Sequence, residues 1–123
     1  MRPEQIRQLS EYKKLIVQGN RKFQPRKDRN YIDDLSEIGL TIEEAWMQIL
    51  SLNKNNYFFD PKPNYKSDKN TLIFKKIINR KMVYIKLKKE IDLSCEIVIC
   101  LSFHIDKKEV GVWYVQIAKK MKQ

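Results

Sequence analysis

The sequence predicts an α+β fold in which N-terminal helices pack on one face of an antiparallel β-sheet. Two observations carry this prediction: helical periodicity dominates the first half of the chain, and strand alternation replaces it from Thr71 onward. Helices followed by strands are typical of α+β domains, whose helices cover one sheet face. The chain has 123 residues, 42% of them hydrophobic, which fits a single domain over residues 1–123.

The helices are predicted from apolar spacing and from their end signals. In PEQIRQLSEYKKLIVQG, residues 3–19, apolar residues recur at the spacing of one helical face, with proline at the start and glycine at the stop. In TIEEAWMQILSL, Thr41 and Glu44 form a capping box, in which each side chain satisfies a backbone N–H at the helix start. Between them, YIDDLSEIG is expected to form a short helix or turn that ends at Gly39.

Strands are predicted where β-branched and aromatic residues gather. The runs are TLIFKKII, KMVYIKLKK and EIVICLSFH, residues 71–78, 81–89 and 96–104. Asn79 and Arg80 form the turn between the first two runs. VGVWYVQIA, residues 110–118, is expected to form a fourth strand or a terminal helix, and the proline-containing stretch 58–70 is expected to form a loop.

Alternation brings polar side chains together on one face of the last two predicted strands. If these strands form a hairpin centred near residues 93–94, burial of their apolar sets places Tyr84 across from His104. The same register places Lys86 across from Ser102 on the outer face. In the last strand, the predicted core-facing set is Ile97, Ile99, Leu101 and Phe103, which leaves Val98 and Cys100 on the outer face.

This polar group suits cleavage of RNA without a metal or cofactor. In that reaction the 2′-hydroxyl loses a proton as it attacks the phosphate, the leaving 5′-oxygen gains one, and cations offset the growing charge. His104 is the only histidine and can exchange protons near neutral pH. His104, Tyr84 and Lys86 are therefore the candidate catalytic residues. The alternative is a cross-strand pair that only covers the sheet.

The charge of the chain favours a polyanionic partner. Lys and Arg number 25 against 15 Asp and Glu, a formal net charge of +10. Nucleic acid is the commonest polyanion in a cell, although a lysine-rich surface can also serve solubility alone. Arg26, Lys27 and Arg29 lie in NRKFQPRKDRN, predicted as a basic loop or irregular strand, and are candidates for binding RNA phosphates.

Cysteine usage and hydropathy indicate the compartment. Cys95 and Cys100 form no CxxC pair, which suggests neither a zinc site nor a disulfide framework and fits a reducing environment. The N-terminal stretch lacks the apolar region of a signal peptide, and no apolar run approaches the roughly 20 residues needed to span a bilayer. We therefore expect a cytoplasmic protein with no membrane association.

Several segments together resemble the MqsR family of toxins from toxin–antitoxin systems, within the broader RelE-like fold. The resemblance covers most of residues 10–104 and runs through SEYKKLIVQG, LSEIGLTIEEAWMQILSL, YFFDPKP, VYIKLK and ICLSFH. It implies an mRNA interferase, which cleaves RNA with or without the ribosome and is held inactive by a cognate antitoxin protein. It matches Tyr84 with the strand of the family's functional tyrosine and His104 with a basic or proton-transferring position.

Two positions depart from the family pattern. Family members often carry a lysine after the aromatic pair matched by YF, where this chain has Phe59, and Lys62 is the candidate substitute. A polar residue expected in the strand matching TLIFKKII is replaced by an apolar one, which makes Lys75 or Lys76 the candidate contact to RNA. The alternative function is a non-catalytic nucleic-acid-binding or regulatory domain that retains the fold.

Overall fold

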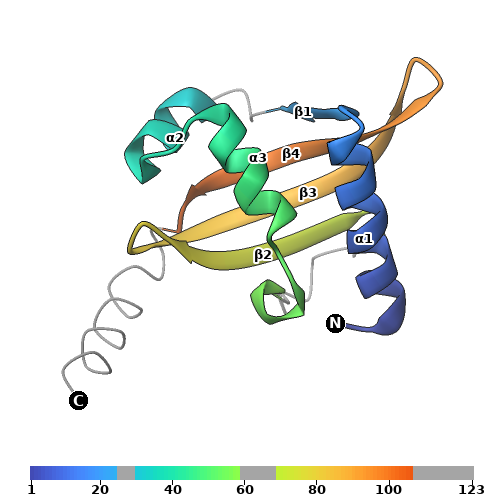
Figure 1. The fold of residues 1–123 in the computed structure, drawn as a ribbon, viewed down its shortest axis with the longest axis horizontal. Helices are drawn as coiled ribbons and strands as arrows, with labels where there is room; N and C mark the ends of the chain where they lie inside the picture. Colours follow the sequence, from blue (N-terminus) through green and yellow to red (C-terminus); the bar gives the residue numbers. More distant parts are fainter. Residues whose placement is uncertain (25–29, 59–68, 107–123) are drawn as a thin grey trace.

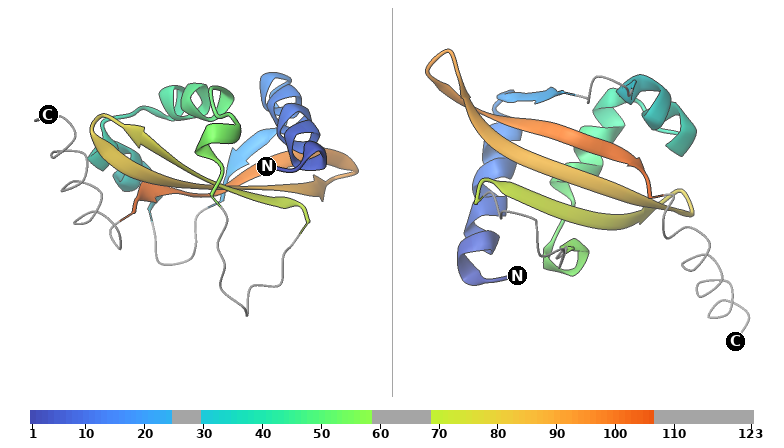
Figure 2. Two further views of the ribbon diagram at one scale, coloured as in Figure 1. Left: turned by 90° about the horizontal axis from the view of Figure 1, so that it is seen from below. Right: turned by 180° about the vertical axis from the view of Figure 1, so that it is seen from behind.

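The chain folds as an α+β domain in which helices cover one face of a four-stranded mixed sheet (Figures 1 and 2). The computed structural model describes residues 1–24, 30–58 and 69–106. The strands lie in the order β1-β4-β3-β2. The elements are α1 (Pro3–Val17), β1 (Arg21–Phe23), α2 (Tyr31–Ile38), α3 (Ile42–Leu50), the 3-10 turn η1 (Lys54–Asn56), β2 (Thr71–Ile78), β3 (Lys81–Asp92) and β4 (Cys95–Ile105).

The predicted α+β class is confirmed, but the sheet is mixed and not antiparallel throughout. β2, β3 and β4 form an antiparallel meander, whereas β1 pairs with β4 in parallel, with Arg21 opposite Val98. Residues 21–23 come from the stretch predicted as a basic loop or irregular strand, and three residues are too few for alternation to reveal a strand. The predicted element at 110–118 lies outside the described residues.

The helices begin and end at the predicted signals. The Thr41 hydroxyl accepts a hydrogen bond from the Glu44 N–H at 3.2 Å, and the Glu44 carboxylate accepts one from the Thr41 N–H at 3.0 Å. Hydrogen bonds from the Thr41 backbone N–H and from the Thr41 side chain to the carboxylate lower the pKa of the Glu44 carboxyl. Gly39 ends α2 with a φ of 93°, a left-handed conformation that glycine adopts without a steric penalty.

The hydrophobic core lies between the helices and the inner face of the sheet, the face that the helices cover in Figure 2. Within the described part of the chain, no helix has the length and apolar character needed to cross a bilayer. The fully buried large side chains include Tyr12, Ile16, Leu35, Ile38, Ile49 and Leu52 from the helical half, and Leu72, Phe74, Val83, Ile85 and Leu87 from the sheet.

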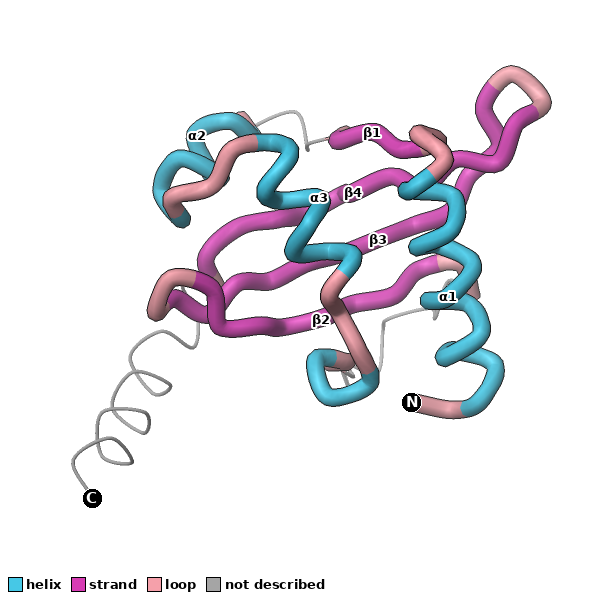
Figure 3. Tube along the Cα trace, viewed as in Figure 1, coloured by secondary structure: helices cyan, strands magenta, loops and turns pink. Residues whose placement is uncertain are grey.

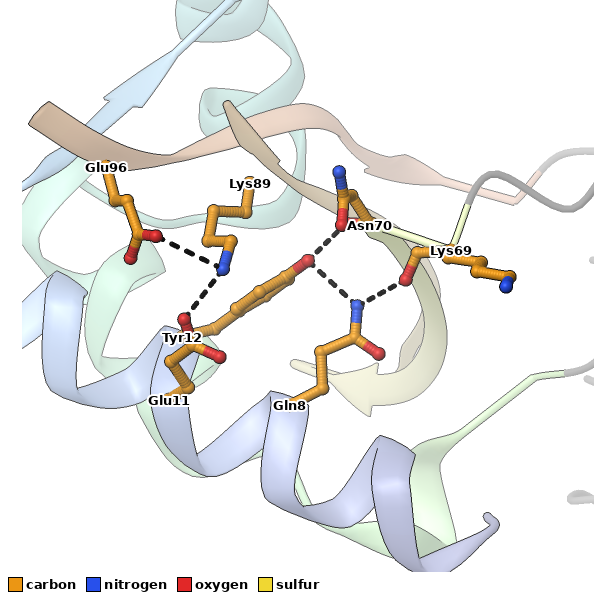
Figure 4. A network of polar contacts seen from close by, with 7 residues as sticks. All are labelled: Gln8, Glu11, Tyr12, Lys69, Asn70, Lys89 and Glu96. Atoms are coloured by element: carbon orange, nitrogen blue, oxygen red, sulfur yellow. Dashed lines mark hydrogen bonds and ion pairs between the residues drawn. The ribbon is translucent and has the colours of Figure 1, made fainter. Parts of the chain in front are cut away.

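A polar network joins α1 to the loop before β2 (Figure 4). The buried hydroxyl of Tyr12 donates to the carbonyl of Asn70 and accepts from the Gln8 amide at 2.9 Å. Gln8 also donates to the carbonyl of Lys69 at 2.7 Å. Burial raises the pKa of Tyr12. The network therefore satisfies a phenol that the core would otherwise leave unpaired.

A second part of the network joins α1 to β3 and β4 (Figure 4). The ammonium of Lys89 lies 2.7 Å from the Glu11 carboxylate and 3.6 Å from the Glu96 carboxylate. The hydrogen bond with Glu11 raises the pKa of Lys89. Lys89 pairs with Val98 on the inner face, so this lysine reaches the edge of the core and bonds to the helix above it.

A β-bulge in β4 decides which side chains face the helices. The register of β3 and β4 shifts between Lys86 and Leu87: Ser102 pairs with Lys86, and Cys100 pairs with Leu87. Leu101 is left with no residue directly opposite. Burial raises the pKa of the Cys100 thiol, as expected for a thiol inside an apolar core.

The predicted core-facing set of β4 is wrong on the hairpin side of this bulge. Val98 and Cys100 belong to the core with Phe103, whereas Ile99, although only 1% exposed, pairs with Lys88 on the opposite face. We call that opposite face the outer face; it carries Tyr84, Lys86, Lys88, Ile99, Ser102 and His104. A one-residue shift moves every following side chain to the other face, which is why uninterrupted alternation assigned residues 97–101 to the wrong sides.

Both hairpins turn through two residues with positive φ. Asn79 and Arg80 have φ values of 51° and 67°, and Leu93 and Ser94 have φ values of 50° and 68°. Positive φ at both central residues matches the right-handed twist of the flanking strands, and asparagine and glycine adopt it most readily. β3 has 12 residues and β2 has 8, so the β3–β4 turn projects beyond the rest of the sheet (Figure 3).

Replacing Leu93→Asn together with Ser94→Gly is expected to stabilise the protein. Left-handed backbone costs an ordinary residue about 1–2 kcal/mol, and asparagine and glycine relieve part of that cost. Urea unfolding should show a gain of about 1–2 kcal/mol in the free energy of unfolding.

Leu93→Ala is the matched control for this variant. Leu93 is 93% exposed, so alanine removes little packing and keeps a Cβ at positive φ. The control should change the free energy of unfolding by less than about 0.5 kcal/mol. If the double variant is no more stable than Leu93→Ala, the turn holds no strain.

Candidate functional site

Three polar side chains form one row across the outer face of the sheet. Lys75 of β2 pairs with Tyr84 of β3, and Tyr84 pairs with His104 of β4. Directly paired residues point to the same face, with Cβ atoms about 4.5–5.5 Å apart. We call Lys75, Tyr84 and His104 the outer row. The predicted pairing of Tyr84 with His104 is confirmed.

The rings of Tyr84 and His104 stack on each other. Their centroids lie 5.5 Å apart and their planes are inclined by 23°. Both residues are half-buried, so each ring keeps an accessible part on the outer face. The stack limits rotation of the imidazole and holds it beside the phenol.

A hydrogen bond fixes the tautomer of His104. Its Nδ1 lies 3.0 Å from the backbone carbonyl oxygen of Ile105. Because a carbonyl oxygen only accepts hydrogen bonds, Nδ1 carries the hydrogen and Nε2 of the neutral ring holds the lone pair. Nε2 is therefore the nitrogen that can take a proton from a bound molecule.

A buried ion pair closes the other end of the outer row. The Lys75 ammonium lies 2.7 Å from the Asp106 carboxylate, and these side chains are only 9% and 11% exposed. The Asp106 N–H donates to the Met82 carbonyl at 2.9 Å, which continues the pairing of β4 beyond His104. The Lys75 ammonium also lies 3.8 Å from the centroid of the Phe58 ring, a cation–π contact.

The neighbouring row supplies another cation. Lys86 pairs with Ser102 on one side, as predicted, and with Ile73 on the other. Lys86 follows Tyr84 by two residues, a step of about 6.8 Å along a strand. The outer face therefore presents the imidazole, the phenol and two lysine side chains from three adjacent strands.

The remaining predicted site residues lie elsewhere. Lys76 pairs with Val83 on the inner face, and its ammonium bonds to the Ser51 hydroxyl at 2.5 Å, so Lys75 and not Lys76 joins the outer row. The other predicted RNA contacts lie outside the described residues: Arg26, Lys27, Arg29 and Lys62.

Sequence reasoning missed Asp106 and Phe58. Asp106 follows His104 by two residues, so the same alternation would have placed it on the outer face if the strand had been extended past His104. The sequence predicts a loop at Phe58. Its backbone N–H bonds to the Ile73 carbonyl at 2.9 Å, and its ring lies against the Lys75 ammonium. No local pattern marks that long-range bond.

Comparison of the chain with known proteins identifies no relative whose site could be aligned with the outer row. No family model, curated protein or solved structure matches the chain. Among residues 1–24, 30–58 and 69–106, no group of three or more His, Cys, Asp and Glu side chains is arranged to hold a metal ion. The chemistry of the site therefore depends on the residues of the outer row and their neighbours.

Asp106→Ala is expected to destabilise the protein strongly. It leaves the buried Lys75 ammonium without this carboxylate, and removing one partner of a buried ion pair typically costs about 3–5 kcal/mol. Replacing both residues, with Lys75→Met and Asp106→Leu, should recover most of the loss in a double-mutant cycle measured by urea unfolding.

The exposed pair of Arg21 and Glu43 provides the control. Its charged atoms lie 3.1 Å apart, but the Glu43 side chain is 79% exposed. Glu43→Ala should therefore cost less than about 1 kcal/mol. If Asp106→Ala is as stable as Glu43→Ala, the buried Lys75–Asp106 pair contributes no more to the free energy of unfolding than an exposed ion pair does.

Proposed function

We propose that the outer row is the active site of an endoribonuclease that cleaves RNA without a metal ion, and that the protein is an mRNA interferase toxin. The observation that carries this proposal is the state of His104. Its Nδ1 bonds to the Ile105 carbonyl, its ring stacks on Tyr84, and its Nε2 holds the lone pair. A positioned imidazole beside a phenol, with the Lys86 side chain in the neighbouring row, is a set of groups suited to phosphoryl transfer.

The positions of these groups support the following reaction. Nε2 of His104 accepts the proton of the ribose 2′-hydroxyl as the 2′-oxygen attacks the adjacent phosphorus. The bond from phosphorus to the 5′-oxygen breaks, and the Tyr84 hydroxyl gives that oxygen a proton. The products are a 2′,3′-cyclic phosphate and a 5′-hydroxyl end. Lys86 offsets the charge that grows on the phosphate oxygens, while the buried Lys75 ammonium stays paired with Asp106.

The biological setting is part of the proposal. The segments that resemble MqsR toxins support a RelE-like arrangement, an mRNA substrate in the cytoplasm, and a cognate antitoxin that blocks the site. The net charge of +10 favours both RNA and an antitoxin with an acidic contact surface. Ribosome association belongs to the same proposal, since the resemblance implies cleavage with or without the ribosome.

His104→Ala should slow single-turnover cleavage of RNA by about 10²–10⁴-fold, the usual effect of losing a positioned acid or base. Tyr84→Phe keeps the stacked ring and removes only the hydroxyl, so a smaller loss is expected. Circular dichroism and thermal unfolding should show that both variants stay folded, because their side chains lie outside the main core. A His104→Ala rate within a few-fold of the unchanged protein would exclude His104 as the catalytic acid or base and leave it a surface residue at the end of a strand.

Cleavage should persist in EDTA and should leave cyclic phosphate ends. Side-chain acid–base catalysis with lysine cations needs no Mg²⁺. The measurement is the rate with chelator and with added Mg²⁺, together with mass spectrometry of the products. The proposal fails if the chelator abolishes cleavage and Mg²⁺ restores it, or if the products carry a 5′-phosphate.

A further inference from the structure

Three polar side chains of α1 bind the chain on both sides of residues 59–68. Gln5, Gln8 and Tyr12 are spaced three and four residues apart, so they lie on one face of the helix. The Gln5 amide donates a hydrogen bond to the Tyr57 hydroxyl at 2.9 Å. Gln8 and Tyr12 donate to the two backbone carbonyls that precede β2 (Figure 4). One helix therefore holds Tyr57 and the start of β2 in place.

Tyr57 is held through its ring as well as its hydroxyl. Its ring meets the ring of Phe74 edge-on, with centroids 6.1 Å apart, and its backbone forms a bridge with the same residue. Phe74 is fully buried on the inner face of the sheet, so Tyr57 points toward that face as well. The backbone at Tyr57 is extended, and successive residues of an extended chain point to opposite sides. Phe58 therefore points toward the outer face.

Phe58 brings an aromatic ring to one end of the outer row. Its N–H bonds to the Ile73 carbonyl at 2.9 Å, and its ring centroid lies 3.8 Å from the Lys75 ammonium. The Asp106 carboxylate holds the same ammonium at 2.7 Å. The ammonium thus lies between a carboxylate and an aromatic ring. A displacement of the ring would therefore displace the ammonium within the outer row.

We infer that Gln5 and Tyr57 are positioning residues of the outer row. They fix Phe58, and the Phe58 ring fixes the Lys75 ammonium. The positioning is independent of the proposed function, but its effect on RNA cleavage rests on that function. Lys75 is the direct neighbour of Tyr84, the proposed proton donor, so a displaced ammonium changes the electrostatic environment of the phenol.

Nuclear magnetic resonance reports the place of the Phe58 ring without any catalysis. A proton over an aromatic face is shifted upfield by the ring current, so the ε-methylene protons of Lys75 should resonate upfield of those of exposed lysines. Phe58→Leu should abolish this shift. Gln5→Ala and Tyr57→Phe should each reduce it, since each removes the bond between α1 and the Tyr57 hydroxyl. Tyr57→Phe keeps the ring against Phe74, and circular dichroism should show that all three variants stay folded.

Gln5→Glu and Gln18→Ala are the matched controls. The carboxylate of Gln5→Glu can accept a hydrogen bond from the Tyr57 hydroxyl, so this variant should keep the Lys75 shift. Gln18 is an exposed glutamine at the other end of α1, about 20 Å from Gln5 along the helix. Gln18→Ala should leave the shift unchanged. If Gln5→Ala and Tyr57→Phe give the same Lys75 shift as Gln18→Ala, Gln5 does not position the ring.

Single-turnover kinetics measure the consequence for cleavage. Gln5→Ala should lower the rate constant at saturating RNA severalfold, a smaller loss than His104→Ala causes. It should leave the half-saturating RNA concentration unchanged, because Gln5 lies on the helix side of the sheet. In the Phe58→Leu background, Gln5→Ala should have no further effect, because the ring through which it acts is absent. An equal loss in both backgrounds would show that Gln5 does not act through Phe58.

The two measurements separate this inference from the proposed function. A Lys75 shift that responds to Gln5→Ala, in a protein that cleaves no RNA, would support the positioning and reject the chemistry at His104. Cleavage by the unchanged protein, with a Lys75 shift that Gln5→Ala does not alter, would support the chemistry and reject the positioning.

Discussion

The unpaired Leu101 in β4 allows one strand to supply both the core and the site. Residues 98 and 100 must face the helices, because their side chains fill the core next to Leu87. Uninterrupted alternation would then turn His104 toward the helices as well. The bulge inserts one residue, so Phe103 stays in the core while His104 faces outward beside Tyr84. The site therefore depends on a local break in the strand as much as on its own side chains.

The second constraint on the site is the ion pair between Lys75 and Asp106. Burying two charges costs desolvation free energy that their attraction does not always repay. Such a pair fixes the positions of its two side chains more reliably than it stabilises the fold. Here it joins β2 to the end of β4 across β3, over the outer face, and the Phe58 ring restricts the lysine further. The ammonium is thereby held at a defined place in the outer row.

The sequence was informative where local rules decide the structure. The capping box of Thr41 predicted the start of α3, and period-two alternation with a two-residue turn predicted the pairing of Tyr84 with His104. The bulge could not be predicted, because residues 97–101 are apolar on both faces and either alternation buries them equally well. The parallel strand β1 depends on a long-range contact with β4, and three residues carry too little pattern to reveal it.

The chain order of the fold affects how it can be synthesised. The helices come first and the strands that cover their apolar faces come last, and β1 pairs with residues 98–100 across most of the chain. Such non-local pairing makes folding slow, since a long loop must close before the contact forms. A ribosome adds about 5–20 residues per second. Several seconds therefore pass between synthesis of the helices and synthesis of the strands on which they pack. The core and the outer row are both completed only after β4 has emerged.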